Sequence, residues 1–345
     1  MKQFLIIQTA FIGDVILATA LIEKLHSYYP DASIDFLLRK GNEGILAGHP
    51  YVRELMIWEK KKDKFKNLFR LLSKIRSKRY DAVINVQRFA ATGMLTTFSR
   101  AKTKIGFDKN PWNHFFDIRV PHIVSTSDRP IHEVDRNQAL IESFTDKIYA
   151  RPRMYPSAND FEKVSKYKRQ PFICIAPASV WFTKQYPAGQ WASFIDSIPN
   201  PPEIFLIGAP NDKILAEEII EASGRKGRIF NLCGQLSFLE SAALMKDAEM
   251  NYVNDSAPMH IASAMNAPVA AVYCSTVPSF GFGPLSDKKF IIEIEKKLDC
   301  RPCGLHGHKV CPLGHFHCAT GIRDEQLVEV LTGSVQQASG NRPNQ

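Results

Sequence analysis

Short apolar runs alternate with stretches of helical periodicity in the N-terminal half of the chain. The strand-like runs are Phe4–Gln8, Ile34–Leu38, Glu54–Trp58 and Ala82–Val86. This alternation is typical of βαβ units, in which a parallel sheet carries helices on its faces. We therefore expect a doubly wound α/β domain in this half.

The C-terminal half repeats the alternation. Phe172–Ala176 and Ile204–Ile207 are typical of buried strands, and a helix is expected over Asp212–Ala222. The chain thus predicts a second doubly wound, Rossmann-like domain. Two such domains facing each other would place the carboxyl ends of both sheets on one central cleft, where open α/β sheets bind their ligands.

A length of 345 residues accommodates two domains of ordinary size. Prolines among polar residues between about positions 121 and 169 indicate a connection between them. The expected parts are an N-terminal domain over 1–155, a linker over 156–170, a C-terminal domain over 171–322, a helix over 323–338 and a disordered tail over 339–345.

The chain is basic, with 44 Lys and Arg against 35 Asp and Glu, a formal net charge of +9. This charge favours an acidic partner: nucleic acid, an anionic membrane or a phosphorylated substrate. No apolar run approaches the roughly 18 residues of a transmembrane helix. The N-terminal FLIIQTAFIGDVILATALI resembles a signal peptide, but Gln8 and Asp14 interrupt it, which favours a strand and a helix. Seven cysteines, an odd number, fit a reducing cytoplasm better than a disulfide framework.

The segment Tyr252–Pro278 is typical of a strand, a sharp turn, a helix and a second strand around a polar cluster. Asn254, Asp255 and Ser256 favour the turn, and Pro258 suits the first turn of a helix. The free N–H groups and positive dipole end of that helix would face the turn and could bind a phosphate or diphosphate. The alternative is an ordinary turn in which Asp255 or Ser256 only caps the helix.

Two further loops carry candidate groups. Gly13 and Asp14 follow the first strand, where Asp14 could accept a proton from an attacking hydroxyl or merely cap the next helix. A single glycine there is not the G-x-G-x-x-G fingerprint of a dinucleotide-binding oxidoreductase. Ser179, Thr183 and Lys184 follow the first strand of the second domain and suit an anionic ligand, although an exposed lysine is often only solvated.

Five collinear segments carry a resemblance to a known family. They are IGDVILATALIEKL, APASVWFTKQYPAGQW, FLIGAPND, NLCGQLSFLESAALMKDAEMNYVNDSAPMHIASAMNAPVAAVYCSTVP and CRPCGLHGHKVCPLGHFHC. Together they resemble the ADP-heptose:lipopolysaccharide heptosyltransferases, inverting glycosyltransferases of the two-domain GT-B fold. The resemblance implies an acceptor-binding N-terminal domain, a nucleotide-sugar-binding C-terminal domain, ADP-heptose as donor and the lipopolysaccharide inner core as acceptor.

The same resemblance implies roles for single residues. Asp14 matches the proposed catalytic base, Lys184 the lysine that contacts the donor diphosphate, and Asp255 the carboxylate that holds donor sugar hydroxyls. Backbone groups that would surround the diphosphate belong to Ser256, Ala257, Pro258, Met259 and His260. The family usually has glycine where Ala257 stands, and alanine would weaken donor binding if that position required a positive φ or a very close approach of the phosphate. No D-x-D motif is present, so no metal or other cofactor is expected to be required.

Cys300, Cys303, Cys311 and Cys318 lie close together in the sequence, among several histidines. Four cysteines could form a structural zinc site, but the spacing C-x2-C-x7-C-x6-C is not a standard zinc-finger pattern. Free thiols in a structural loop are the favoured interpretation.

Residues 60–79 form a basic stretch in which Phe65, Leu68, Phe69, Leu72 and Ile75 recur at helical spacing. We expect this apolar stripe to pack on the sheet. The cationic rim, with Lys60, Lys61, Lys62 and Lys64, is expected to face the acceptor and an anionic membrane. The protein would then act in the cytoplasm, peripherally at the inner membrane.

Other functions remain open from the sequence. No residue distinguishes heptose from another sugar, so a GT-B enzyme with a different nucleotide sugar is the first alternative. A non-enzymatic basic protein that binds nucleic acid or a membrane is the second, although no nucleic-acid-binding module is present and no nucleic acid partner is expected. A catalytically silent relative is disfavoured because Asp14 and Lys184 are retained.

Overall fold

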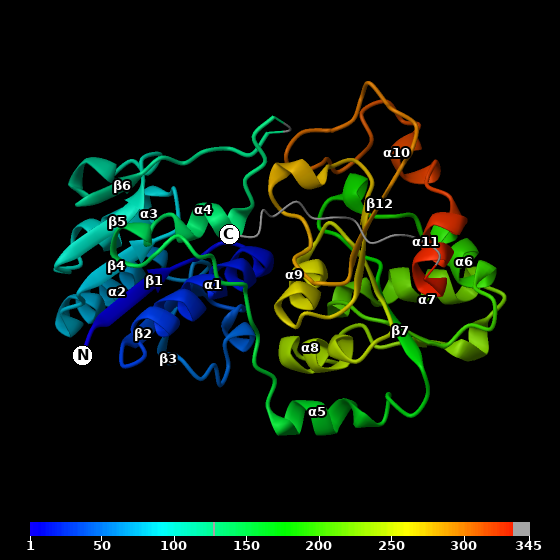
Figure 1. Ribbon diagram of the computed structural model, residues 1–345, viewed down its shortest axis with the longest axis horizontal. Helices are drawn as coiled ribbons and strands as arrows, with labels where there is room; N and C mark the ends of the chain where they lie inside the picture. The colour runs from blue at the N-terminus through cyan, green and yellow to red at the C-terminus, as the bar shows by residue number, and fades with distance from the viewer. Residues whose placement is uncertain (127, 334–345) are drawn as a thin grey trace. The chain divides into compact units, whose positions relative to one another are not determined.

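The computed structural model describes residues 1–126 and 128–333. The chain divides into two compact units, Met1–Tyr155 and Pro156–Gln345. Each unit contains a six-stranded sheet whose strands all run parallel, with helices packed around it (Figure 1). The expected α/β class with two Rossmann-like units is therefore confirmed.

The sheet of the first unit has the strand order β3-β2-β1-β4-β5-β6. Its strands are β1 (Gln3–Ile7), β2 (Ser33–Arg39), β3 (Val52–Trp58), β4 (Ala82–Asn85), β5 (Thr103–Phe107) and β6 (Ile118–Val120). Its helices are α1 (Ile12–Tyr28), α2 (Lys64–Lys78), α3 (Ala90–Thr97) and α4 (Glu133–Gln138).

The sheet of the second unit has the order β12-β11-β10-β7-β8-β9. Its strands are β7 (Phe172–Ala176), β8 (Glu203–Leu206), β9 (Ile229–Asn231), β10 (Asn251–Asn254), β11 (Val269–Tyr273) and β12 (Lys289–Glu293). Its helices are α5 (Ala158–Ser165), α6 (Ala188–Ser197), α7 (Lys213–Ala222), α8 (Phe238–Lys246), α9 (Ala257–Ala264), α10 (His317–Thr320) and α11 (Asp324–Thr332).

Both sheets have the same doubly wound topology, because the first strand of each lies beside the fourth. The chain crosses to opposite sides of the sheet from these two strands, so the loops that follow them diverge and leave a crevice at their carboxyl ends. In the first unit this switch point lies between β1 and β4, and in the second between β7 and β10. Ligand-binding residues are expected in the loops after these strands.

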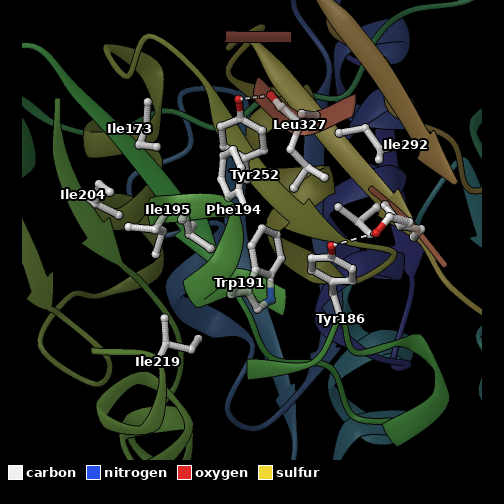
Figure 2. Packing of buried hydrophobic residues seen from close by; sticks show 14 of the residues in the cluster. Ile173, Tyr186, Trp191, Phe194, Ile195, Ile204, Ile219, Tyr252, Ile292 and Leu327 are labelled. Carbon is white, nitrogen blue, oxygen red and sulfur yellow. Dashed lines mark hydrogen bonds between the residues drawn. The ribbon is translucent and has the colours of Figure 1, made fainter. Parts of the chain in front are cut away.

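The core of the second unit is rich in aromatic residues (Figure 2). The rings of Phe194 and Tyr252 lie 4.7 Å apart, and those of Tyr186 and Trp191 lie 5.0 Å apart in an edge-on arrangement. Such pairs each contribute about 0.5–1.5 kcal/mol beyond the burial of their surface. The Tyr252 hydroxyl also donates a hydrogen bond of 2.8 Å to the carbonyl of Leu327, which joins α11 to the central strand β10.

Residues 156–170, expected to be a linker, include α5 and belong to the second unit. Ser157 and Asp160 form a reciprocal capping box that starts α5, a helix signal outweighed in the sequence by the nearby prolines. Lys163 of α5 pairs with Glu240 of α8 at 2.7 Å, so α5 packs on the second unit.

The remaining differences concern short strands and the C-terminus. Strands β5, β6, β9 and β12 were not expected, because their sequences are short or mix charged and apolar residues. Of the helix expected over 323–338, α11 is described as far as Thr332, and the tail expected over 339–345 lies outside the described residues.

Candidate functional site

Two loops at the switch point of the second unit bring together a cation and an anion. Lys184 ends a short 3-10 helix, Phe182–Lys184, that follows β7, and Asp255 directly follows β10. The Lys184 Nζ lies 2.7 Å from Asp255 Oδ2, with only 15% and 10% of the two side chains exposed. Asp255 also accepts a hydrogen bond of 2.7 Å from the hydroxyl of Thr276, which follows β11. The solvated interpretation of Lys184 is therefore wrong.

Helix α9 begins beside this pair without a side-chain cap. Ser256 is the N-cap residue, yet its side chain accepts no hydrogen bond from the first turn. Its hydroxyl instead donates to the carbonyl of Asn254 at 3.4 Å. Because Asp255 is bound to Lys184 and Thr276, the interpretation in which Asp255 or Ser256 only caps α9 is not supported. Pro258 has no N–H, and the N–H of Met259 donates to the carbonyl of Ser256 at 3.1 Å. The positive dipole end of the helix lies next to a lysine, an arrangement suited to an anion.

Ala257 is the first residue of α9 and has no positive φ. Glycine is therefore not required here for a left-handed backbone, and the effect of Ala257 on a closely approaching phosphate stays a prediction. Pro258 occupies the first turn, where its missing N–H costs nothing. Both residues are half-buried.

The next two residues of α9 face the interior. Met259 is buried, and its sulfur accepts a hydrogen bond from the hydroxyl of Tyr273 at 3.4 Å. His260 is buried, and desolvation together with the charge of Lys184 lowers its pKa to about 3. His260 is therefore neutral at physiological pH and contributes no charge to the site.

Thr183 and Ser179 differ in their surroundings. Thr183 is only 1% exposed, and its hydroxyl oxygen accepts hydrogen bonds from Ser275 Oγ at 3.0 Å and from the backbone N–H of His308 at 2.7 Å. Ser179 is half-buried, and its N–H donates to Gln185 at 3.3 Å. The Thr183 hydroxyl oxygen therefore accepts from two protein groups, and the expected role of Thr183 in donor binding stays a prediction.

The sequence provided no indication of how these loops are braced. Asn254 is fully buried, accepts a hydrogen bond from the N–H of Tyr186 at 3.0 Å and donates to the carbonyl of Pro177 at 2.7 Å. It thereby holds both ends of the loop that carries Lys184. An asparagine at a strand end favours a turn in general, so its reach to a distant loop has no local sequence signal.

In the first unit, Asp14 lies in the opening turn of α1. Its Oδ2 accepts a hydrogen bond of 3.1 Å from the N–H of Phe11, the N-cap residue. The capping role that the sequence left open is therefore present. Arg136 lies nearby, and burial and the charge of Arg88 lower its pKa to about 10, while the negative charge of Asp14 acts in the opposite direction. Asp14 thus interacts electrostatically with Arg136, which also pairs with Glu133.

Lys60 has a different position from the one expected. Its ammonium donates to the Thr9 carbonyl at 2.7 Å and to the Thr9 hydroxyl at 3.0 Å, so it braces the β1–α1 loop that leads to Asp14. Burial and neighbouring cations lower its pKa to about 8. Asn42 supports the same loop by donating to the Ala10 carbonyl at 3.0 Å. Lys60 is therefore part of the loop framework rather than of an outer cationic rim.

The lysines at the two ends of α2 have different surroundings. In the C-terminal half, Lys74 pairs with Glu54, and Lys78 pairs with Glu54 and with Asp35. At the other end, Lys64 is exposed at the start of α2, and so are Lys61 and Lys62 in the residues just before it.

The apolar stripe was expected to pack on the sheet as a whole. Leu68 and Ile75 are buried as expected, but Phe65 and Phe69 are 69% and 61% exposed. Their placement in the packed stripe was therefore wrong, because helical periodicity does not say how far a neighbouring sheet extends. No helix in residues 1–126 and 128–333 is both long and apolar enough to cross a bilayer.

The cysteine segment gains no support as a zinc site. Its cysteines are free, with Cys318 buried and Cys300, Cys303 and Cys311 half-buried. Across the described part of the chain, no three or more His, Cys, Asp or Glu side chains are arranged to hold a metal ion. The segment does, however, contact the site, because the N–H of Cys303 donates to the carbonyl of Ser275 at 2.8 Å.

Comparison with known proteins places this geometry in context. Residues 68–314 match the model of glycosyltransferase family 9 (heptosyltransferase), a range that includes Lys184 and Asp255 but not Asp14. Lipopolysaccharide heptosyltransferase 3 of Escherichia coli is 26% identical over 283 residues, 77% of this chain and 82% of that protein.

Two solved structures share the fold. The glycosyl transferase family 9 protein of Veillonella parvula has a TM-score of 0.83 at 20% identity, and the E. coli ADP-heptose lps heptosyltransferase II one of 0.77 at 21%. Each comparison covers 96% of this chain and 98% of the other.

Proposed function

The chain belongs to glycosyltransferase family 9 and is a glycosyltransferase. On this premise we propose that it transfers L-glycero-D-manno-heptose, with inversion, from ADP-heptose to the lipopolysaccharide inner core, either Kdo-lipid A or a heptosyl acceptor. The observation that carries the donor assignment is the Lys184–Asp255 pair beside the uncapped N-terminus of α9. The names of the relatives support a heptose carried by ADP and a lipopolysaccharide acceptor. The configuration of the heptose and the inner-core acceptor come from the family resemblance alone.

The donor diphosphate would lie at the N-terminus of α9, where the positive end of the helix dipole and the Lys184 ammonium would meet its negative charge. These groups also offset the charge that develops on ADP as the glycosidic bond breaks. Asp255 lies one residue before the N-cap and would hold sugar hydroxyls through its carboxylate. The proposal requires no further cofactor, because two positive groups already act on the leaving group.

Asp14 would act as the general base. The acceptor hydroxyl attacks the anomeric carbon from the face opposite ADP, and the Asp14 carboxylate accepts its proton as the new bond forms. Its hydrogen bond from Phe11 does not prevent this role, because an ionised carboxylate offers about four acceptor positions. The bond instead orients the side chain at the carboxyl end of β1.

We further propose that the protein works in the cytoplasm at the inner-membrane surface. The support is the start of α2, where Phe65, Phe69 and Lys64 are exposed, together with the exposed Lys61 and Lys62 that precede the helix. Apolar rings flanked by cations suit the interface of an anionic bilayer. A lipid-linked acceptor would be met on that surface.

The test is ADP release by the purified protein from ADP-L-glycero-D-manno-heptose, with and without truncated core acceptors. We expect release that depends on one acceptor, which also identifies the transfer step. Competition by other nucleotide sugars decides between heptose and another donor. A folded protein that releases no ADP with any core acceptor refutes the proposed transfer.

A further inference from the structure

The segment from Cys300 to Cys318, which the proposed function does not use, lies against the loop that carries Lys184. The backbone N–H of His308 donates to Thr183 Oγ1 at 2.7 Å, and the N–H of Thr183 donates back to the His308 carbonyl at 3.1 Å. Ser275 closes the arrangement, since its hydroxyl donates to Thr183 at 3.0 Å and its carbonyl accepts from Cys303 at 2.8 Å. Two elements distant in sequence are thus joined around one threonine.

The start of the segment is anchored as well. Arg301 donates from Nε to the Cys274 carbonyl and from Nη2 to the Thr276 carbonyl, each at 2.8 Å. Both acceptors lie just beyond β11, and Thr276 is also the residue whose hydroxyl donates to Asp255. The segment is therefore attached to the same edge of the sheet as the Lys184–Asp255 pair.

Gly307 makes the closest approach to the lysine. It has a φ of +75°, and a Cβ placed on it would lie 2.8 Å from Thr183 Oγ1, 3.1 Å from Lys184 Cγ and 3.2 Å from Ser275 Oγ. The absence of a side chain allows the backbone to pack directly on the stem of Lys184. Any larger residue must displace Thr183, Lys184 or Ser275.

We propose that Gly307 and His308 are positioning residues of the donor site, which hold Thr183 in place and through it fix the Lys184 ammonium beside the α9 N-terminus. This inference rests on the proposed role of Lys184 in donor binding. In this proposal the cysteine segment packs against Lys184 and limits its movement. The buried Thr183 hydroxyl has a connector role, because it links the segment to the loop that carries Lys184. Donor binding then depends on backbone packing that touches no ligand.

The chain offers a matched control for Gly307. Gly304 lies in the same segment with a φ of +68°, yet a Cβ placed on it would meet nothing within 4 Å. Gly304→Ala and Gly307→Ala therefore introduce the same left-handed alanine, and only Gly307→Ala displaces the Lys184 loop. A difference between the two variants reports the contact rather than backbone strain.

The experiment measures ADP binding by calorimetry for the wild-type protein and both variants, with thermal unfolding as the check on folding. We expect Gly307→Ala to weaken ADP binding by about tenfold or more, as for the loss of one charge-assisted contact, with Gly304→Ala staying within about twofold of wild type. Equal binding by the two variants overturns the inference. A wild-type protein that binds no ADP refutes the proposed donor site itself.

A double-mutant cycle with Lys184→Ala separates positioning from a general structural effect. If Gly307 acts through the lysine, Gly307→Ala should change ADP affinity by less than about twofold once Lys184 is alanine. Additive losses overturn the inference. Should Gly307→Ala fail to fold, Thr183→Val and Thr183→Ser carry the test: loss of ADP affinity in the first and retention in the second support the connector role, and equal affinities contradict it.

Discussion

Lys184 and Asp255 form an ion pair of 2.7 Å between the loops that follow β7 and β10, the two strands at the switch point of the second sheet. The pair leaves α9 without a side-chain cap, because the nearest carboxylate is bound to the lysine and to Thr276. The ion pair thus holds the Lys184 ammonium in place and keeps Asp255 from capping the N-terminus of α9, which stays available for an anion.

Replacing the lysine tests this relationship. Lys184→Met keeps the length of the side chain and removes its charge, so we expect kcat/KM to fall by about 10²–10³-fold, the usual loss for one electrostatic contact to a leaving group. ADP affinity should fall with it. Steady-state kinetics and calorimetry give both values, and an unchanged ADP affinity would contradict the diphosphate role.

Asp14 has a cap role in the structure and a base role in the proposal, and one substitution distinguishes them. Asp14→Asn can still accept the hydrogen bond from Phe11 but cannot take up a proton. We expect kcat to fall by about 10²–10⁴-fold with ADP affinity and unfolding temperature close to wild type. Retained turnover in this variant would leave Asp14 with the cap role alone.

The exposed face of α2 should determine membrane binding. Combining Phe65→Ala with Phe69→Ala is expected to lower partitioning into anionic vesicles by about tenfold, and each lysine removed should add about fivefold, equivalent to about 1 kcal/mol. Vesicle co-sedimentation measures this, with Ile214→Ala as a control that removes an equally exposed apolar side chain, 73% accessible, from the other unit. Partitioning that does not change in the phenylalanine variant, or stronger binding to DNA than to vesicles, would count against the membrane surface.

Acid should destabilise the protein partly through His260. Its pKa is about 3 in the folded chain against an ordinary 6.5, so below pH 6.5 the unfolded chain takes up a proton that the folded chain does not. The free energy of unfolding should therefore fall as pH drops from about 6.5 toward 4, and His260→Gln should make this slope shallower by about 1.4 kcal/mol per pH unit. Urea unfolding at several pH values measures the slope, with His306→Gln, at an exposed position, as the control. Identical slopes in wild type and the His260 variant would show that the histidine is protonated in the folded state.

Much of the architecture could be predicted from local pattern. Strand β7 occurs where the apolar run indicated, because a strand buried on both faces leaves a strong sequence signal, and helix α6 begins at Ala188 as expected. The edge strands β6 and β9 are short and partly exposed, so their pairing with neighbours rather than their composition defines them.

The sequence by itself determined the two doubly wound domains and the residue types at the strand ends, since burial periodicity and turn chemistry are local properties. Only the tertiary structure decided what those residues do. It paired Lys184 with Asp255, turned Lys60 toward Thr9, left Phe65 and Phe69 uncovered and placed Gly307 on the stem of Lys184. The contacts among these outcomes join groups far apart in the chain. Their free energy depends on the distance that the fold sets between the two groups, which no local sequence pattern contains.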